Sequence, residues 1–345
     1  MKALVWEGPR KMSLLDQPLP EPDADEVLVK VAYAGICGSE LSGYLGHNAL
    51  RVPPLIMGHE FAGRIETLGS EASKHNPSLR VGQQITVNPL ISCGDCAYCR
   101  QGKAHLCAAR QLIGAHRAGA YATYVRVPGR SAVPLPTGMS LRTGALTEPV
   151  AVAVRIARLA TLHTSDDVLI IGAGPIGLLT LQVLLLENVR RVFIVDLDGE
   201  RLKMGKMLGG EPLHPERTDI VRAIREATLE RGVRCAVDAV GTSQTRAQCV
   251  AATQSGGTVI LTGLHEETSL MPAAEIIRRE IIVQGSFAYS PADFADALEL
   301  LAQQKVRLDP WIIEAPLSDG GKWFDNLTDS KSSKQAAKIL LIPEL

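Results

Sequence analysis

The chain has 345 residues, of which 46% are hydrophobic and only 4% aromatic, and its formal net charge is −1. This length allows about two domains with sizeable cores, and those cores must be mostly aliphatic. The balanced charge gives no sign of a surface that binds nucleic acid or an anionic membrane. The opening residues MKALVWEG read as a short strand, without the apolar core and cleavage site of a signal peptide. We therefore expect a cytoplasmic protein whose seven cysteines are metal ligands or core thiols rather than disulfides.

The first 140 residues read as mostly β structure. Residues 26–33 alternate apolar and polar positions, as in a half-buried antiparallel strand. Further short runs of this kind cover 61–68, 84–87 and 121–127, with glycine and proline between them. We therefore expect a barrel-like β domain at the start of the chain.

Three fragments far apart in the sequence carry side chains that can bind a metal. They are Gly35-Ile36-Cys37-Gly38-Ser39-Glu40, Gly58-His59-Glu60 and Thr147-Glu148-Pro149. A thiolate, an imidazole and a carboxylate from three such places can form a zinc site that leaves one position open. Each fragment alone is weak evidence, because a lone cysteine or histidine is more often a core or surface residue than a ligand.

Four cysteines lie within fifteen residues in the spacing C-x2-C-x2-C-x7-C; they are Cys93, Cys96, Cys99 and Cys107. Four thiolates so close together match a closed tetrahedral zinc site, which would hold together a lobe with few apolar residues. Disulfides are the alternative, but they require an oxidising compartment. The spacing therefore predicts a structural zinc ion in a lobe around residues 90–110.

The second part of the chain is organised around a glycine-rich turn. A short apolar run, residues 168–171, reads as a buried strand. Three glycines follow it in the spacing G-x-G-x-x-G: Gly172, Gly174 and Gly177. A long aliphatic stretch and a second apolar run, 192–195, then lead to Asp196. This order is typical of dinucleotide binding, with the pyrophosphate at the helix N-terminus and the carboxylate on the adenosine ribose.

Two alternatives compete with a dinucleotide site. Residues 168–186 hold no charged side chain, so a hydropathy window would read them as a membrane span. Three glycines and Pro175 in the first third of that stretch make a poor uninterrupted helix but suit a phosphate-binding turn. A chance glycine pattern is the other alternative, and the flanking strand, helix and acidic residue argue against it.

The rest of the chain supplies further strands and helices. Candidate parallel strands cover 233–238, 257–261 and 281–284, and they alternate with helix-length segments. Residues 293–304 read as a helix and 337–342 as a closing strand. This pattern predicts an α/β unit with a doubly wound parallel sheet after the β domain.

With both cysteine sets and the glycine turn, the chain resembles the zinc-dependent medium-chain dehydrogenase/reductase family. The stretches that carry the resemblance are AGICGSE, MGHEFAG, LTEPVAVAV and GAGPIG, together with the four-cysteine lobe. The polyol branch, which includes the sorbitol and galactitol-1-phosphate dehydrogenases, is the most similar. The family's architecture implies a GroES-like β-barrel catalytic domain over residues 1–149, a Rossmann NAD-binding domain over 150–290, and a return segment, 291–345, that completes the catalytic domain.

The resemblance implies a role for each matching residue. Cys37, His59 and Glu148 match the ligands of a catalytic zinc, and Glu60 matches a glutamate that touches the zinc or its water. Ser39 matches the hydroxyl that passes the substrate proton toward solvent, and the four lobe cysteines match the ligands of the structural zinc. The implied contacts of NAD are Gly172, Gly174, Pro175, Ile176, Gly177, Asp196, Arg201, Val240, Leu261, Gly263, Ser286 and Phe287.

Three departures from the family's pattern concern the substrate. Glu40 stands in place of the usual aspartate, Gly43 in place of a tyrosine of animal sorbitol dehydrogenases, and Ala288 in place of the arginine in their Phe-Arg-Tyr stretch. The two smaller side chains predict a roomier pocket, lined by Ser39, Tyr44, Glu60, Glu148 and Tyr289. Arg51 and Arg117 are candidate partners for a substrate phosphate.

The resemblance implies reversible oxidation of a secondary alcohol of a polyol or sugar-alcohol phosphate, with two zinc ions per subunit and hydride transfer to NAD. A 2,3-butanediol or L-threonine dehydrogenase with similar zinc ligands is the enzymatic alternative. A catalytically silent NAD-binding protein is the other, although a scaffold has no use for an open metal site. We expect a homodimer or homotetramer, and the sequence leaves open whether Glu60 or Glu148 is the resting zinc ligand.

Overall fold

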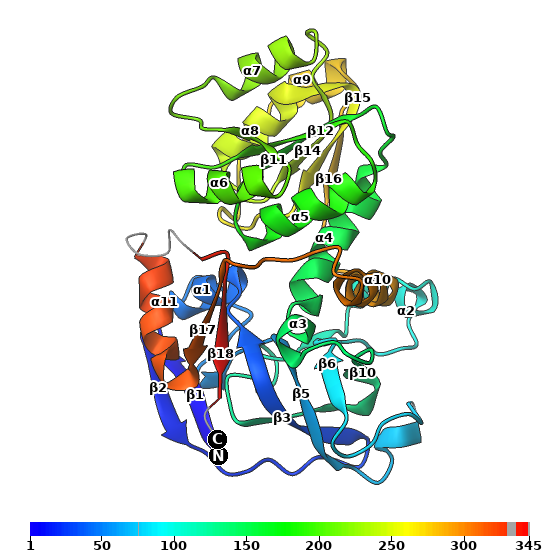
Figure 1. Ribbon diagram of the computed structural model, residues 1–345, viewed down its shortest axis with the longest axis vertical. Helices are drawn as coiled ribbons and strands as arrows, with labels where there is room; N and C mark the ends of the chain where they lie inside the picture. Colours follow the sequence, from blue (N-terminus) through cyan, green and yellow to red (C-terminus); the bar gives the residue numbers. More distant parts are fainter. Residues whose placement is uncertain (75, 330–335, 344–345) are drawn as a thin grey trace. The chain divides into compact units, whose positions relative to one another are not determined.

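The computed structural model describes residues 1–74, 76–329 and 336–343, and the chain divides into two compact units (Figure 1). Unit 1 consists of Met1–Glu148, Ser290–Gln304 and Asp309–Leu345, and unit 2 of Pro149–Tyr289 and Lys305–Leu308. Within the described ranges, none of the helices combines the length and the apolar character needed to cross a bilayer. The uncharged stretch 168–186 is instead divided between a strand and a helix of twelve residues.

Unit 1 is built mainly from β strands. Its largest sheet contains β3 (Glu26–Gly35), β5 (Glu60–Leu68), β6 (Gln84–Val87), β9 (Tyr124–Pro128), β10 (Ala132–Pro134), β17 (Ile312–Pro316) and β18 (Lys338–Ile342). The strand order is β10-β6-β5-β3-β18-β17, and β9 also pairs with β3. A smaller sheet joins β1 (Lys2–Gly8), β2 (Lys11–Asp16) and β4 (Leu55–Ile56) in the order β2-β1-β4.

The closing strand β18 is part of the centre of unit 1. It lies between β3 and β17, so that strands from the two ends of the chain are neighbours (Figure 1). Leu340 pairs with Gly35 and Leu341 with Ala34. Leu341 also belongs to the apolar core that holds Val29 of β3. The C-terminal segment is therefore needed to complete the core of unit 1.

Short helices flank these sheets. They are α1 (Gly38–Tyr44), α2 (Ala97–Arg100), α3 (Leu141–Gly144), α10 (Pro291–Ala302) and α11 (Gly320–Thr328). Tyr44, the last residue of α1, packs its ring against Phe324 of α11 with 5.3 Å between the ring centroids. Its hydroxyl donates a hydrogen bond to Asp325 Oδ1 at 2.6 Å. This contact fixes α1 against α11.

Unit 2 has a six-stranded parallel sheet with the strand order β13-β12-β11-β14-β15-β16. The strands are β11 (Asp167–Ile171), β12 (Arg191–Val195), β13 (Glu211–Leu213), β14 (Val233–Asp238), β15 (Thr253–Leu261) and β16 (Ile282–Gly285). The helices are α4 (Thr147–Ala160), which begins in unit 1, α5 (Pro175–Leu186), α6 (Gly199–Met207), α7 (Ile220–Ala227), α8 (Ser243–Ala252) and α9 (Ala273–Arg278). The order reverses direction at β11, as in a dinucleotide-binding fold.

Helices cover both faces of this sheet. Leu169 of β11 belongs to a buried cluster with Ile224 of α7 and Val250 of α8. Its neighbour Ile170 faces the opposite side, where its Cγ2 atom would lie 3.5 Å from a Cβ atom added to Gly177 of α5. Alternate residues of the strand are therefore buried on opposite faces, and the sheet is doubly wound, as predicted.

The short segment Lys305–Leu308 belongs to unit 2, whereas the sequence analysis placed it in the return segment to unit 1. The side chain of Gln182 in α5 explains the difference. Its Nε2 donates to the Arg307 carbonyl oxygen at 2.9 Å, and its Oε1 accepts from the Arg307 N–H at 3.0 Å. Val306 and Leu308 on either side are buried.

Two glycines of the turn after β11 differ in the space around them, and this difference gives a test. A Cβ atom on Gly177 would lie 1.8 Å from the carbonyl oxygen of Gly172, whereas one on Gly174 would meet nothing within 4 Å. We expect Gly177→Ala to lower the free energy of unfolding by about 1–3 kcal/mol. Gly174→Ala should change it by less than about 0.5 kcal/mol.

Gly174→Ala should nevertheless weaken dinucleotide binding, because its methyl group would occupy the space that a pyrophosphate needs against the backbone. Urea denaturation measures the change in unfolding free energy of both variants, and titration with NADH followed by fluorescence measures the dinucleotide affinity of Gly174→Ala. Unchanged NADH affinity in Gly174→Ala would show that this turn does not hold the pyrophosphate.

Candidate metal and dinucleotide sites

Three predicted ligands of the catalytic zinc meet at one end of the β3–β5 pair. Cys37 follows β3 by two residues, His59 precedes β5, and Glu60 is the first residue of β5. The antiparallel register places Glu60 opposite Gly35. Cys37, His59 and Glu60 each offer a ligand atom, and these atoms all lie within 4.8 Å of one another. This set of a thiolate, an imidazole and a carboxylate fits a zinc site with an open position.

A fourth carboxylate, from Glu40, lies behind these ligands and orients them. Its Oε1 contacts His59 Nδ1 at 2.7 Å and accepts the Gly58 N–H at 2.9 Å. Its Oε2 accepts the Cys37 N–H at 3.1 Å and a hydrogen bond from the Tyr121 hydroxyl. The Nδ1 atom of His59 is thus engaged, which leaves Nε2 for a metal.

Glu40 is fully buried but remains ionised. Burial alone would raise the pKa of its carboxyl group, but the charge on His59 and its hydrogen bond lower that pKa to about 2. Glutamate at this position supplies a carboxylate, as the aspartate usual in the family would, on a side chain that is longer by one methylene group. The contacts of Glu40 could not be predicted from the sequence, because all its hydrogen-bond partners except Cys37 lie 18 to 81 residues away along the chain.

Sequence analysis missed Lys338, which forms a buried ion pair with Glu60 from the closing strand β18. Burial alone would lower the pKa of Lys338, but the charges of Glu60, Cys37 and Glu148 and the hydrogen bond to Glu60 together outweigh burial and raise that pKa. Gly35 provides the space for this pair, since a Cβ atom there would lie 2.3 Å from Glu60 Oε2. The signal in the sequence is a lysine near the start of the predicted closing strand 337–342, followed by four apolar residues.

Glu148 lies near the same site but outside the group of three ligands. It is the second residue of α4 and is buried, and its charge acts on Lys338. The group of ligand atoms within 4.8 Å contains Glu60 and does not include Glu148.

Ser39 lies beside Cys37, as its predicted role requires. Its hydroxyl donates to Cys37 Sγ at 3.5 Å. Arg51 approaches from the other side, with Nη1 donating to the Ser39 carbonyl oxygen at 3.2 Å and Nη2 donating to Ser39 Oγ at 3.3 Å.

The expectation that Gly43 opens space in the pocket is wrong. A Cβ atom on Gly43 would lie 2.8 Å from Arg51 Cδ, so the arginine side chain already fills that space. Tyr44, predicted to line the pocket, is 1% exposed and faces α11 instead. Arg117, a candidate phosphate partner, forms an ion pair with Glu26, the first residue of β3. Tyr289 is buried in unit 2.

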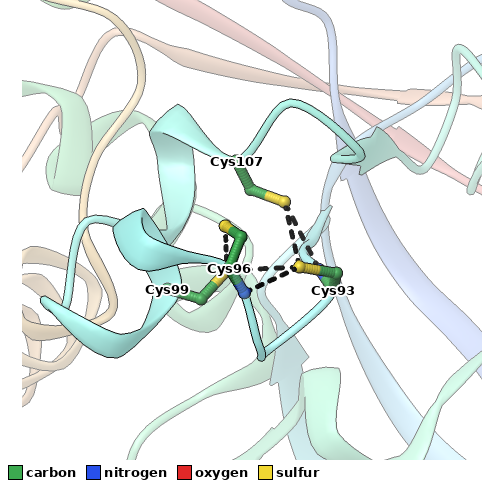
Figure 2. Close-up of side chains that lie close together, drawn as sticks. All are labelled: Cys93, Cys96, Cys99 and Cys107. Carbon is green, nitrogen blue, oxygen red and sulfur yellow. Dashed lines mark hydrogen bonds between the residues drawn. The ribbon is translucent and has the colours of Figure 1, made fainter.

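The four lobe cysteines converge as the spacing predicts (Figure 2). The lobe is framed by β7 (Leu90–Ile91), which pairs with β8 (Gln111–Leu112). The Sγ–Sγ distances are 3.5 Å for Cys93–Cys107, 3.5 Å for Cys96–Cys99 and 3.8 Å for Cys93–Cys99. A tetrahedron with Zn–S bonds of about 2.3 Å has edges of about 3.8 Å, so this arrangement fits a closed zinc site.

Backbone amides prepare this lobe for a cation. The N–H groups of Asp95 and Cys96 lower the pKa of the Cys93 thiol to about 6, so it is ionised at neutral pH. The N–H of Cys93 points to Cys107 Sγ at 3.5 Å. None of the seven cysteines is disulfide-bonded in this structure, and the lobe sulfurs are spaced for a shared cation.

The residues predicted to bind NAD follow the strands of unit 2 at their carboxyl ends. Gly172 follows β11, Asp196 follows β12, and Ser286 follows β16. Ligands of doubly wound sheets bind along this edge, near the point where the strand order reverses. Gly172 adopts a φ of +107°, which permits the tight turn into α5. Pro175 and Ile176 are the first two residues of that helix.

Asp196 is held in place by backbone amides. Its Oδ2 accepts the Ala173 N–H at 2.7 Å and its Oδ1 accepts the Asp198 N–H at 2.9 Å. Arg201 of α6 is 4.0 Å away from Oδ2. The carboxylate is thus fixed next to the glycine turn, where an adenosine ribose would bind.

The other predicted contacts fit a ligand at this edge of the sheet. Val240 and Phe287 have 36% and 46% of their surfaces exposed, and Leu261 ends β15. Gly263 lies close to the backbone of Val240: a Cβ atom on Gly263 would be 2.2 Å from the Val240 carbonyl carbon. The Ser286 Oγ atom is buried without a hydrogen-bond partner, which suits a site that receives a polar ligand.

Glu40 gives the sharpest test of the metal site. Glu40→Gln removes the charge that holds His59 and the Cys37 backbone, and such a change beside metal ligands typically costs 10- to 100-fold in metal affinity. We expect the variant to lose the zinc held by Cys37 and His59 on mild dialysis and to keep the zinc of the cysteine lobe. Metal analysis of the dialysed protein measures this, with Glu66→Gln on the exposed side of β5 as the control. Full zinc content in Glu40→Gln would contradict the role of this carboxylate.

Comparison with known proteins agrees with both units. Residues 23–137 match the alcohol dehydrogenase GroES-like domain and residues 175–303 match the zinc-binding dehydrogenase family. Sorbitol dehydrogenase of Halalkalibacterium halodurans is 32% identical over 351 residues, covering 99% of each chain. D-arabitol-phosphate dehydrogenase of Enterococcus avium is 30% identical over 344 residues, covering 97% of this chain and 96% of the relative.

Solved structures give the same result. Galactitol-1-phosphate dehydrogenase from Escherichia coli has a TM-score of 0.89 at 29% identity, covering 99% of this chain and 100% of the other. A protein of Sinorhizobium meliloti described as a zinc-binding dehydrogenase, bound to NADP, has a TM-score of 0.90 at 30% identity and covers 99% of each chain. With its GroES-like unit, its parallel-sheet unit and its two groups of zinc ligands, the chain is a member of the zinc-binding alcohol dehydrogenase family.

Proposed function

We propose that the protein oxidises a secondary hydroxyl group of a polyol or a sugar-alcohol phosphate to the ketone, reversibly, with NAD as the hydride acceptor. The observation that carries this proposal is the group formed by Cys37, His59 and Glu60, with the Ser39 hydroxyl beside it. A protein that only bound a dinucleotide would have no use for such a group, which argues against the silent alternative.

Ser39 and Glu40 have different roles in the proposed reaction. Bound at these ligands, zinc supplies a positive charge that favours loss of the alcohol proton, and NAD supplies the acceptor for the hydride. Ser39 accepts the proton of the substrate hydroxyl and passes its own proton onward. Glu40 keeps His59 in one orientation and one tautomer. These contacts are in place before the substrate arrives, so little reorganisation is required during the reaction.

We propose distinct roles for the two glutamates. Lys338 holds Glu60 in an ion pair, so with zinc bound Glu60 would be available as a further carboxylate near the ion without being a permanent ligand. Glu148 is then the resting third ligand, with Cys37 and His59. A buried charge pair of this kind is costly to break by removing one partner, because the other charge is left uncompensated.

The polyol class is supported by the two relatives that act on polyols or their phosphates and by the carboxylate-bearing ligand set. A polyol can contact a metal through adjacent hydroxyl groups, which a simple monoalcohol cannot. The 2,3-butanediol and L-threonine dehydrogenases have similar zinc ligands and remain the alternative substrate classes.

Asp196 supports the choice of NAD over NADP. A phosphate on the 2′-hydroxyl of the adenosine ribose would lie near its carboxylate, and such like-charge contacts cost several kcal/mol. Arg201 at 4.0 Å is the residue that opposes this discrimination. The NADP bound to the similar Sinorhizobium meliloti protein makes the comparison of the two cofactors worth measuring here.

We further propose that copies of the chain associate, with the edge strand β16 of unit 2 as the contact. Ile282 and Val283 on this strand are 55% and 36% exposed, and Ile277 of α9 is 74% exposed. An unpaired strand edge with exposed apolar side chains is suited to pairing with another chain. A monomer at micromolar concentration in analytical ultracentrifugation would exclude this.

We also propose a reducing compartment such as the cytoplasm. The support is that all seven cysteines are free and that four of them are placed to bind a metal as thiolates. Localisation of a tagged chain to an oxidising compartment would contradict this.

The substrate prediction is tested by a screen that follows NADH absorbance. We expect five- and six-carbon polyols or their phosphates to give the highest kcat/KM, well above ethanol. With the best substrate, NADP should give a kcat/KM about a hundredfold or more below that of NAD. If 2,3-butanediol or L-threonine surpasses every polyol and polyol phosphate, the substrate class is wrong although the zinc and NAD chemistry stands.

The roles of the two glutamates are tested by metal analysis. Glu148→Ala should lose the catalytic zinc and keep the zinc of the cysteine lobe. Glu60→Gln should keep both ions while kcat falls about a hundredfold, a typical loss for a residue that takes part in proton transfer or charge stabilisation. The exposed Glu66→Gln again serves as the control. The reverse pattern of zinc loss would exchange the two assignments.

A further inference from the structure

One buried cation of unit 1, Arg51, forms no ion pair among the described residues, although its charge helps to lower the pKa of the nearby Glu40 carboxyl group. Arg51, between α1 and β4, is 3% exposed. Among the described residues, no carboxylate lies within ion-pair distance of its guanidinium, and its Nε has no hydrogen-bond partner. Arginine stays protonated in proteins, so this position holds a permanent buried charge. Such a charge is costly, and its contacts show what it achieves.

Both side-chain hydrogen bonds of Arg51 go to one residue, Ser39. Nη1 donates to the Ser39 carbonyl oxygen at 3.2 Å and Nη2 donates to Ser39 Oγ at 3.3 Å. The side chain reaches Ser39 by crossing Gly43, where a Cβ atom would lie 2.8 Å from Arg51 Cδ. The absence of a side chain at position 43 therefore serves to admit the arginine.

These two bonds determine what the Ser39 hydroxyl can do. A hydroxyl group has one proton to donate and two lone pairs to accept with, whereas a guanidinium can only donate. The bond from Nη2 occupies one lone pair and keeps the hydroxyl proton pointing elsewhere; here it points to Cys37 Sγ at 3.5 Å. One lone pair is left for an incoming proton.

We propose that Arg51 is a positioning residue that gives proton transfer through Ser39 its direction. The inference rests on the proposed dehydrogenase function. As the substrate O–H bond breaks, a new O–H bond forms at the free lone pair of Ser39 Oγ. The original Ser39 proton gives up its contact with Cys37 Sγ and passes to a solvent water molecule, so one proton arrives and one departs, and neither Ser39 nor Arg51 is changed. The bond to the carbonyl oxygen of Ser39 holds the backbone so that the oxygen does not turn away.

A phosphate-binding role for Arg51, considered from the sequence, is less well supported. Both Nη atoms already donate to Ser39, and the remaining Nε is enclosed by protein. A substrate phosphate would have to displace these bonds.

The test is a double-mutant cycle with Arg51→Met, Ser39→Ala and the double variant. Arg51→Met keeps most of the side-chain volume over Gly43 and removes the donors. We expect its kcat with the best substrate to fall about 100-fold, the lower end of the range for general acid–base effects, with an unchanged KM for NAD. Because Arg51 acts through Ser39, the same change in the Ser39→Ala background should alter kcat by less than about twofold.

Two further readouts separate this role from a purely structural one. The solvent deuterium isotope effect on kcat should rise in Arg51→Met, because proton transfer becomes slower than the other steps. Arg51→Lys should recover part of the loss, since its ammonium keeps a donor on a flexible stem. The melting temperature and the zinc content of both variants should match those of the wild type.

The matched control is Arg117→Met, which removes a partly buried arginine of unit 1 that pairs with Glu26. It should lower the melting temperature and leave kcat unchanged. Additive effects in the cycle, or an unchanged isotope effect in Arg51→Met, would overturn the proposal. If Arg51→Met fails to fold, the same cycle with Arg51→Lys decides, because lysine offers a single donor group in place of the arginine fork.

A measurement without substrate tests the link between Arg51 and Ser39 independently of the proposed dehydrogenase activity. Cobalt(II) exchanged into the open site gives a thiolate absorption band that reports on hydrogen bonds to Cys37 Sγ. Arg51→Met should shift this band when Ser39 is present and should not shift it in the Ser39→Ala background. Failure of the wild type to oxidise any alcohol overturns the proposed function alone, whereas an unshifted band overturns the link between Arg51 and Ser39.

Discussion

The buried carboxylate of Glu40 is the contact on which the metal site depends. Through hydrogen bonds it joins the start of α1, the residues before β5 and the Tyr121 hydroxyl. No two of these segments are adjacent in sequence, and the shared acceptor connects them. Burial raises the pKa of Tyr121, with Glu40 adding to the effect, so the phenol remains a donor. One ionised group therefore holds the Cys37 backbone, which follows β3, and the His59 imidazole, which precedes β5.

Unit 1 buries several charged side chains close to this carboxylate, in addition to its apolar core. Lys338 and Arg51 bring two buried positive groups to a region that holds Glu40, Glu60 and the Cys37 thiol. Each cation enters over a glycine, Gly35 for Lys338 and Gly43 for Arg51. The glycines thus determine which charges can come close, and larger residues at either position would force a cation away from the site.

Sequence patterns predicted those parts of the structure whose residues lie close together along the chain. The lobe cysteines and the glycine turn each lie within about fifteen residues, so their spacing reveals their geometry, and the periodicity of β14 predicts its bounds of Val233–Asp238. The contacts of Lys338 and Arg51 could not be predicted in this way. The first crosses from one end of the chain to the other, and the second depends on the path of an irregular loop. For the same reason Gly43 was interpreted as an empty space, since a sequence does not show which distant side chain fills it.

The position of β18 has a consequence for how the protein is made. Leu340 pairs with Gly35, so the two edges that close the main sheet of unit 1 are separated by almost the whole chain. At about 5–20 residues per second, a ribosome needs roughly 15 to 60 seconds to go from one to the other. Throughout that time the edge of β3 that faces β18 is unpaired and Glu60 lacks its lysine, while the strands of unit 2 emerge in an unbroken run. Unit 2 is therefore able to fold first, and the enzyme's metal site is finished last.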